Sequence, residues 1–180
     1  MRLDSPYKHV GNVSQELVNQ ALSLIKPEHW LFDTTRNTMA NLENTQSIIL
    51  RYFDEYQSRA QQDWKKRIVN KPLQPLYELI INEFLAELKK HYEFTEYMVF
   101  FAKLLPYSTV GFHIDSGRFL ESCNRIHIPL KTNKDVFYII ENVEYNWTVG
   151  NIYEFDNTRV HGVKNNSGEE RIHLMFNLYN

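Results

Sequence analysis

The residues of this chain that could do chemistry are two histidines, an aspartate and an arginine in its second half. His113 and Asp115 are separated by one residue, and His161 precedes Arg171 by ten positions. Two histidines and one carboxylate on one face of Fe(II) leave positions that O2 and a bidentate 2-oxo acid can fill. In an extended strand, residues i and i+2 point to the same face, so His113 and Asp115 would project together while Ile114 turns into the packing layer. The pattern predicts a mononuclear iron site, to which His161 must come from another strand.

The surroundings of these residues decide how much the pattern means. An isolated His-x-Asp is common by chance, and a lone histidine beside a strand is more often a surface or core residue than a ligand. Here small turn residues follow Asp115, as the mouth of a barrel would require. The segment 150–156 is typical of a strand, and a short polar turn joins it to His161. Three candidate ligands on suitably placed strands indicate a metal site more strongly than any one of them does.

Arg171 opens the segment 171–179, whose strict alternation predicts a buried strand that carries this cation inward. A buried guanidinium without a partner is very costly, so a carboxylate should meet it. The planar guanidinium suits bidentate binding, which favours the carboxylate of a ligand. The alternative is an ordinary ion pair with Glu154 or Asp156.

Residues 97–179 resemble the aspartyl/asparaginyl beta-hydroxylase family of Fe(II)- and 2-oxoglutarate-dependent dioxygenases, which includes bacterial hydroxylases of free proline. The pieces that carry the resemblance occur in a fixed order along the chain: Pro106 and Gly111, the stretch 124–130, the segment 147–156, His161, and the stretch 171–174. Together these pieces are fairly specific for the family.

The resemblance implies an α+β fold with a double-stranded beta-helix, also called a jelly roll or cupin-like core, and N-terminal helices packed on its major sheet. It implies that Fe(II) is held by His113, Asp115 and His161. Arg171 would bind the distal carboxylate of the co-substrate 2-oxoglutarate, and His127 would lie against the same molecule. Arg125 shares the strand face of His127 and is placed for an acidic group of the substrate or co-substrate, unless it is a surface arginine at a strand end. No catalytic residue beyond the metal ligands is expected.

Two departures from the family pattern bear on the substrate. The peptide-modifying members lack the carboxylate ligand that Asp115 supplies here, whereas the members that act on free amino acids have it. Ala102 stands where the peptide-modifying enzymes place a serine that hydrogen-bonds 2-oxoglutarate. The first departure favours a small-molecule substrate, and the second indicates a co-substrate pocket that differs from that of the peptide-modifying enzymes.

The composition limits the partners and the setting. A net charge of -2 and a pI near 6.4 give no electrostatic reason to expect nucleic acid or an anionic membrane as a partner. The single cysteine, Cys123, excludes an intrachain disulfide and suits a reducing cytoplasm. The N-terminus lacks the apolar core of a secretory signal, and no stretch approaches the roughly 20 apolar residues of a membrane helix. We expect a cytoplasmic chain whose 180 residues form one domain.

Residues 1–95 are expected to give mainly helical support, and residues 96–180 to form the strands that carry the metal site. One helix is predicted from Asn12 as its cap to about residue 25, and a clearer one begins at Pro75 with a single apolar stripe. A third is expected between residues 54 and 69. From residue 97 onward, short runs of β-branched and aromatic residues alternate with polar turns, as in a barrel or jelly roll.

Several residues outside the motif are candidates for contact with the substrate. Segment 41–52 combines a polar loop with a strand-like end that could cross the barrel mouth, where Arg51 would be the residue to test if it does not simply face solvent. Tyr107, Phe112 and Trp147 could form walls of the pocket, although most aromatic residues should belong to the core.

Three functions remain open from the sequence. The leading hypothesis is a 2-oxoglutarate-dependent dioxygenase that hydroxylates a free amino acid or a similar small polar metabolite with O2. The second is the same chemistry on an aspartyl, asparaginyl or other residue of a peptide or protein. The third is a non-catalytic, cupin-like metal-binding protein, which would give no reason for a buried Arg171 beside the metal.

Overall fold

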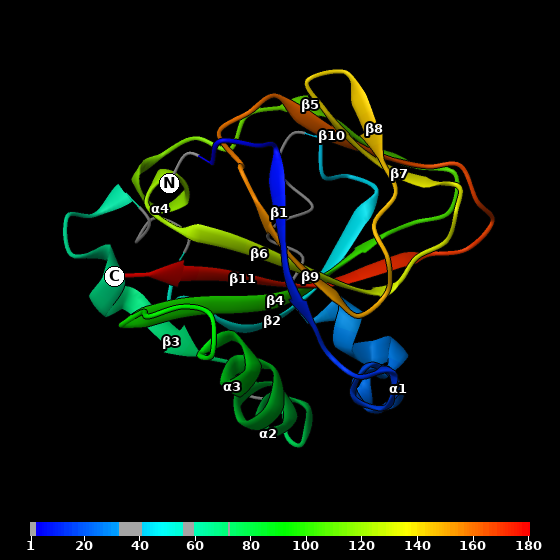
Figure 1. Cartoon of the computed structure of the whole chain (residues 1–180). Coiled ribbons are helices and arrows are strands. Elements are labelled where there is room, and N and C mark those ends of the chain that lie inside the picture. Colours follow the sequence, from blue (N-terminus) through cyan, green and yellow to red (C-terminus); the bar gives the residue numbers. More distant parts are fainter. Residues whose placement is uncertain (1–2, 33–40, 56–59, 72) are drawn as a thin grey trace.

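The computed structural model describes residues 3–32, 41–55, 60–71 and 73–180 (Figure 1). Its strands pair antiparallel in two sheets, one with seven strands and one with four. In spatial order the large sheet contains β1 (Tyr7–Asn12), β9 (Asn151–Phe155), β6 (Asn124–Lys131), β11 (Arg171–Tyr179), β4 (Glu96–Leu104), β2 (Thr45–Phe53) and β3 (Ile68–Asn70). The small sheet contains β5 (Thr109–His113), β10 (His161–Asn165), β7 (Val136–Ile140) and β8 (Val143–Tyr145). The expected jelly roll is thus confirmed.

Strand β11 is the centre of the large sheet, and all nine of its residues are buried. Successive side chains of a strand point to opposite faces, so the alternation in 171–179 divides the strand between two environments. Ile172, Leu174 and Phe176 pack into the largest hydrophobic cluster on the outer face. Arg171 and Met175 point to the inner face, where they line a cavity. The central strand therefore carries polar chemistry on the side that faces the small sheet.

Helices cover the outer face of the large sheet, as predicted. Figure 1 shows α1 (Gln15–Leu24), α2 (Leu76–Leu79) and α3 (Leu85–Leu88) on the side of this sheet away from the small sheet. A π-helical turn, η5 (Ile80–Phe84), joins α2 to α3. The apolar stripe predicted after Pro75 is buried against the sheet, and each fully buried leucine or isoleucine side chain contributes about 1.5–3 kcal/mol.

The start of the first helix differs from the prediction. Ser14, not Asn12, is the N-cap, because its side chain accepts a hydrogen bond from the Leu17 backbone N–H. Asn12 instead ends β1, where it pairs with Asn151 of β9. Asn12 and Ser14 both precede the apolar stripe. Because Asn12 is paired with β9 as the end of β1, Ser14 takes the cap position. After α1 comes a short 3-10 helix, η1 (Pro27–Leu31).

The first 95 residues were expected to give mainly helical support. In the structure they also supply strands to the large sheet. These strands are β1, β2 and β3. In segment 54–69, where a helix was expected, the described residues form only a 3-10 helix, η4 (Trp64–Arg67), followed by β3. Residues 56–59 of that segment lie outside the described ranges.

A short helix, α4 (Arg118–Glu121), follows the metal motif. In the described part of the chain, no helix is long and apolar enough to cross a membrane.

Candidate active site

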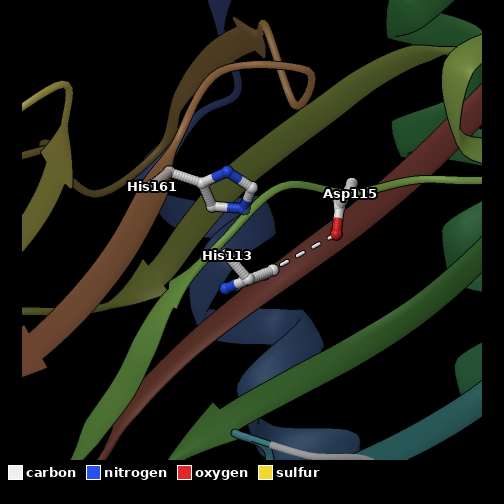
Figure 2. Close-up of side chains that lie close together, drawn as sticks. All are labelled: His113, Asp115 and His161. Atoms are coloured by element: carbon white, nitrogen blue, oxygen red, sulfur yellow. Dashed lines mark ion pairs between the residues drawn. The ribbon is translucent and has the colours of Figure 1, made fainter.

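The structure brings His113, Asp115 and His161 together at one end of the small sheet. His113 ends β5 and His161 begins β10, and the two residues are directly paired across the strands. Their ring centroids are 4.2 Å apart. One ligand atom from each of the three residues lies within 4.8 Å of the others. Figure 2 shows Asp115, on the segment after β5, facing His113, with Nε2 of His113 3.6 Å from an oxygen of Asp115.

The position of Asp115 differs from the expectation of a simple two-residue alternation. Strand β5 ends at His113, and Ile114, which was expected to be packed, is 51% exposed. The backbone N–H of Asp115 donates to the carbonyl of Asn157 at 3.1 Å. Asn157 itself is buried and stands in the turn that leads into β10. Asp115 is therefore positioned by the turn that precedes His161 and not by a continuing strand.

A β-bulge in β5 lies directly before the first histidine. Val110 pairs with Val163 and His113 pairs with His161, so Gly111 and Phe112 together stand opposite the single residue Gly162. A bulge adds one residue to a strand and redirects the side chain that follows it. Because of this extra residue, Val110 and His113 both face the cavity although they are three positions apart.

Both histidines are held in the orientation that a metal requires. Nδ1 of His113 lies 2.7 Å from the Gly111 carbonyl oxygen, and Nδ1 of His161 lies 2.8 Å from the Arg159 carbonyl oxygen. A carbonyl only accepts, so each Nδ1 carries the proton and each Nε2 keeps its lone pair for a ligand bond. Burial lowers the pKa of His161 to about 4, a shift that Asp115 and the Arg159 carbonyl only partly offset. This imidazole is therefore neutral near pH 7, and the donor set fits a divalent iron.

The turn between β9 and β10 is fixed by Asp156, which is fully buried. Its carboxylate accepts hydrogen bonds from the backbone N–H of Leu3 at 3.2 Å and from the Thr158 hydroxyl at 2.6 Å. Arg159 Nε lies 3.1 Å from the same carboxylate. Burial raises the pKa of Asp156, but the hydrogen bonds from Thr158 and Arg159 outweigh it, so the pKa lies below its ordinary value. The network holds the residue whose carbonyl orients His161.

A cavity of about 200 Å³ lies between the two sheets beside these three residues. Its polar lining comes from both sheets and includes His113, Asp115, His161, Arg125, His127 and Arg171. All of the predicted site residues therefore line one cavity. Its apolar lining includes Ala102, Val110, Phe155, Val163 and Met175.

Arg171 is buried in this cavity, with 4% of its surface exposed. Its guanidinium donates to the hydroxyl of Tyr138 and lies 5.1 Å from the centre of that ring. Burial lowers the pKa of Arg171, and Tyr138 offsets only part of that effect. Among the residues that the structure describes, no carboxylate pairs with this guanidinium. An unpaired buried cation is costly, so the site is built to receive an anionic group.

The two acidic residues considered as partners for Arg171 are engaged elsewhere. Glu154 accepts hydrogen bonds from Tyr92 at 2.9 Å and from Asn124 at 2.6 Å. Asp156 belongs to the turn network with Arg159. The ordinary ion-pair interpretation of Arg171 is therefore wrong for both.

Arg125 is also buried, with 8% exposed, so it is not a surface arginine at a strand end. Its Nε lies 3.3 Å from Asp115 Oδ2, and its Nη1 donates to the Asn177 side-chain oxygen at 3.1 Å. Burial lowers the pKa of Arg125, but Asp115, together with Cys123, Tyr52 and Tyr138, more than compensates, so the net pKa is raised. A guanidinium has five N–H donors, so these two contacts leave others for a ligand in the cavity.

His127 and Tyr138 form a polar link across the cavity wall. His127, on β6, lies with Nδ1 2.9 Å from the hydroxyl of Tyr138 on β7. That hydroxyl accepts from Arg171, and an arginine cannot accept in return, so the phenolic proton is available to His127. Tyr138 was missed by sequence reasoning. The alternation of Val136, Tyr138 and Ile140 could have placed Tyr138 on a buried face. The neighbouring sequence, however, gives no sign that Tyr138 contacts Arg171 on the other sheet.

Most of the other suggested contact residues lie away from the cavity. Tyr107 is 76% exposed and Phe112 is 56% exposed. Trp147 is buried, but it stacks behind Tyr138 and does not line the cavity. Arg51 neither lines the cavity nor faces solvent freely, because it forms an ion pair with Glu96 at 2.7 Å.

Segment 41–52 does reach the cavity, through residues that were not singled out. They are Leu42, Thr45 and Gln46. Their position follows from the pairing of β2 with β4, a long-range contact that no local pattern in this segment specifies.

A jelly roll that joins two histidines and an aspartate beside a buried, unpaired arginine defines the class of 2-oxo-acid-dependent iron oxygenases. Residues 31–180 match the family described as aspartyl/asparaginyl beta-hydroxylase. Because the match covers most of the chain, this protein belongs to that family. It is accordingly a 2-oxoglutarate-dependent non-haem iron dioxygenase, with Fe(II) as its metal and 2-oxoglutarate as its co-substrate.

Solved structures with low sequence identity share the fold. A Trichoplax adhaerens prolyl hydroxylase, in complex with a hypoxia inducible factor oxygen degradation domain peptide fragment, is 12% identical with a TM-score of 0.63, covering 98% of this chain and 84% of that chain. For a Pseudomonas putida prolyl-4-hydroxylase the identity is 14% and the TM-score 0.55, with 98% and 94% covered. An oxidoreductase of the 2OG-Fe(II) oxygenase family from Burkholderia pseudomallei is 16% identical with a TM-score of 0.53, and the match covers 74% of this chain. This chain spans 65% of the length of that protein. No curated protein matches the sequence.

Proposed function

We propose that this dioxygenase hydroxylates a free amino acid or a similar small polar metabolite that carries a carboxylate. In this proposal His113, Asp115 and His161 hold Fe(II), and Arg171 binds the distal carboxylate of 2-oxoglutarate. The observation that carries the substrate class is a second buried arginine, Arg125, in the same small cavity. A ligand can reach it only by entering the cavity.

The protein residues position the reactants. Bound Fe(II) would let O2 decarboxylate 2-oxoglutarate oxidatively and so supply the oxidant for hydroxylation. Arg171 neutralises one end of the co-substrate, and the Tyr138 hydroxyl, which also contacts His127, fixes the guanidinium from the side. Arg125 holds Asp115 in place through their ion pair and keeps donors for the carboxylate of the substrate. None of these residues needs to act as an acid or base when the substrate C–H bond is broken.

The size of the cavity supports a small substrate. The same cavity of about 200 Å³ must hold the five-carbon co-substrate as well as the substrate. The room that is left near Arg125 suits a molecule with few atoms. A peptide would have to pass along the mouth with a single side chain inserted.

The second candidate is hydroxylation of a residue in a peptide or protein. It is favoured by the name of the family and by the Trichoplax adhaerens structure, which is described as a complex with a peptide fragment. Under this hypothesis Arg125 would bind the inserted acidic side chain. A non-catalytic cupin-like metal protein is disfavoured, because it gives no reason for the unpaired Arg171.

The test begins with anaerobic addition of Fe(II) and 2-oxoglutarate, which should give the weak visible charge-transfer band of the chelate. Air is then admitted, and succinate is measured with a panel of free amino acids and with peptides that contain the same residues internally. We expect free amino acids to stimulate succinate formation more than the matched peptides do. Stimulation by the peptides alone would replace our proposal with the second candidate.

Two variants anchor the experiment. His113→Ala and Asp115→Ala should abolish coupled turnover, because each removes a metal ligand. Arg118→Ala is a matched control, since Arg118 follows the motif closely but is exposed. A metal-binding chain that gives neither the chelate band nor succinate with any substrate would favour the non-catalytic hypothesis.

A further inference from the structure

Behind the cavity wall lies a stack of oxidisable aromatic rings, to which the proposed hydroxylation assigns no role. Tyr138, which lines the cavity, stacks on Trp147 with ring centroids 4.0 Å apart and planes inclined by 16°. Trp147 stacks in turn on Tyr153 at 4.7 Å and 12°. Tyr7 lies 5.6 Å from both of these rings. The four rings form a continuous path of tyrosine and tryptophan away from the metal ligands.

The path runs from a buried to a partly exposed end. Tyr138, Trp147 and Tyr153 are each less than 7% exposed. Tyr7, on the edge strand β1, is half-buried and contacts the half-buried Tyr145 at 5.0 Å. Solution reductants can therefore reach the outer end, whereas the inner end meets only the cavity.

Stacking distinguishes this path from ordinary core packing. Aromatic pairs have both offset-stacked and edge-to-face minima, and the pairs around Trp64 are all edge-to-face, at 64–74°. The rings of Tyr138, Trp147 and Tyr153 are nearly parallel, which brings their π systems into contact. Electron transfer between rings requires a short distance between them, and the outer ring, Tyr7, meets this condition at 5.6 Å although it lies edge-to-face on Trp147 and Tyr153, at 63° and 74°.

Protons are arranged so that charge can move along the path. The Tyr138 hydroxyl can release its proton to His127 Nδ1, 2.9 Å away, when the ring loses an electron. The indole N–H of Trp147 is buried and has no hydrogen-bond partner in the described part of the chain. An oxidised Trp147 therefore has no base to which it can lose its proton, so it stays strongly oxidising and takes an electron from the next tyrosine.

We propose that Tyr138, Trp147, Tyr153 and Tyr7 form an aromatic relay that carries electrons into the cavity when 2-oxoglutarate is consumed with no substrate in place. The relay rests on the proposed function, because O2 and 2-oxoglutarate supply the oxidant. Decarboxylation gives succinate and CO2 and leaves one oxygen atom, which two electrons and two protons convert to water. At the outer end, two molecules of a small thiol supply those electrons and protons and become a disulfide. The relay thus spares the cavity residues from oxidation.

The test is turnover without substrate. Wild type, Trp147→Phe and Tyr7→Phe are loaded anaerobically with Fe(II) and 2-oxoglutarate, then exposed to O2 with and without a thiol. Succinate is measured, freeze-quenched samples are examined by EPR for tyrosyl and tryptophanyl radicals, and peptide mass mapping locates oxygen insertion. Trp64→Phe is the matched control, since Trp64 is equally buried but belongs to a separate cluster.

In wild type we expect a protein radical and protection by thiol. In Trp147→Phe the radicals beyond Tyr138 should be lost, and oxidation of Met175, His127 and Tyr138 per succinate formed should rise several-fold whether or not thiol is present. Tyr7→Phe, at the tolerant outer end, should lose the thiol protection while the initial rate of succinate formation is unchanged. Trp64→Phe should behave as wild type.

The two possible failures can be told apart. Succinate formed with the same radical signal and the same oxidation per succinate in all four proteins would overturn the relay alone. No succinate from wild type under any condition would overturn the proposed function, and the relay with it.

Discussion

Gly162 stands opposite the bulge in β5, and a Cβ atom added to it would come within 2.9 Å of the carbonyl oxygen of Val110. The same atom would lie 3.3 Å from the Phe112 ring. The backbone oxygen cannot move aside as a flexible side chain can, so the two strands would have to separate. His113, at the end of the bulge, and His161, next to Gly162, would then lose their direct pairing.

We predict that Gly162→Ala weakens metal binding by about tenfold, the lower end of what is lost when the groups that orient metal ligands are disturbed. Titration with Co(II), followed by its visible spectrum, measures the change in affinity and in ligand geometry. Gly168→Ala is the control, because its added Cβ would meet only the hydroxyl end of the exposed Tyr107 side chain at 3.1 Å. An unchanged Co(II) affinity and spectrum in Gly162→Ala would show that the bulge does not set the metal geometry.

Arg171→Ala should mainly raise the requirement for 2-oxoglutarate. The cavity would lose its unpaired cation, and removal of one partner from a buried charge pair costs about 2–5 kcal/mol of binding. The dissociation constant of 2-oxoglutarate, measured from the chelate band, should increase by at least about thirtyfold. Arg171→Lys should recover only part of the loss, because a lysine cannot bind a carboxylate through two parallel hydrogen bonds.

Metal affinity provides the control for that experiment. Within the described part of the chain the Arg171 guanidinium contacts Tyr138 and forms no ion pair with the three metal ligands, so Co(II) should bind Arg171→Ala as it binds wild type. An unchanged 2-oxoglutarate requirement in Arg171→Ala would show that its assigned role is wrong.

Asp156 should make stability depend on pH. Its pKa in the folded protein lies below the value of about 3.9 in an unfolded chain, so its stabilising contribution is complete above that value and is lost as the pH falls through the folded pKa. Asp156→Asn should lower the free energy of unfolding at pH 7 by about 1–3 kcal/mol, because buried donors of Thr158 and Arg159 lose their charged acceptor.

Urea unfolding of wild type and Asp156→Asn between pH 7 and pH 3 measures this effect. The difference between them should shrink below about pH 4, where the Asp156 carboxylate of the unfolded wild-type chain begins to be protonated. Glu141→Gln is the control, since it removes the exposed partner of Arg159 and leaves the buried one intact. A difference that stays constant down to pH 3 would contradict the assignment to this carboxylate.

The sequence predicted the parts of the site that depend on local alternation. Arg171 faces inward because strand 171–179 alternates strictly, and His127 shares its face with Arg125 for the same reason. The outer helices followed from the apolar stripe after Pro75. In these segments the repeat of apolar residues along the sequence shows which face of the element is buried, so the direction of each side chain follows from the sequence.

The rest depends on contacts between distant segments. Asp115 is set by a hydrogen bond to Asn157, and the bulge before His113 lies opposite Gly162 of β10. Neither is visible within the His-x-Asp motif, which is why Ile114 was expected inside and is found outside. Tyr138 comes from the small sheet and contacts Arg171 on the large one, a pairing fixed by the closure of the two sheets.

Tyr138→Phe should weaken 2-oxoglutarate binding and leave the metal site intact. The hydroxyl fixes the Arg171 guanidinium, and a hydrogen bond to a charged group is worth about 1.5–3 kcal/mol, so the dissociation constant should rise by roughly tenfold or more. Ala102→Ser, which adds a hydroxyl to the cavity wall from β4, should recover part of the affinity in the Tyr138→Phe background. The double-mutant cycle is read from the chelate band, with Co(II) affinity as the reference that should not move. Full 2-oxoglutarate affinity in Tyr138→Phe would mean that Arg171 is held by its strand alone, and equal effects of Ala102→Ser in both backgrounds would show that the two hydroxyls do not serve the same carboxylate.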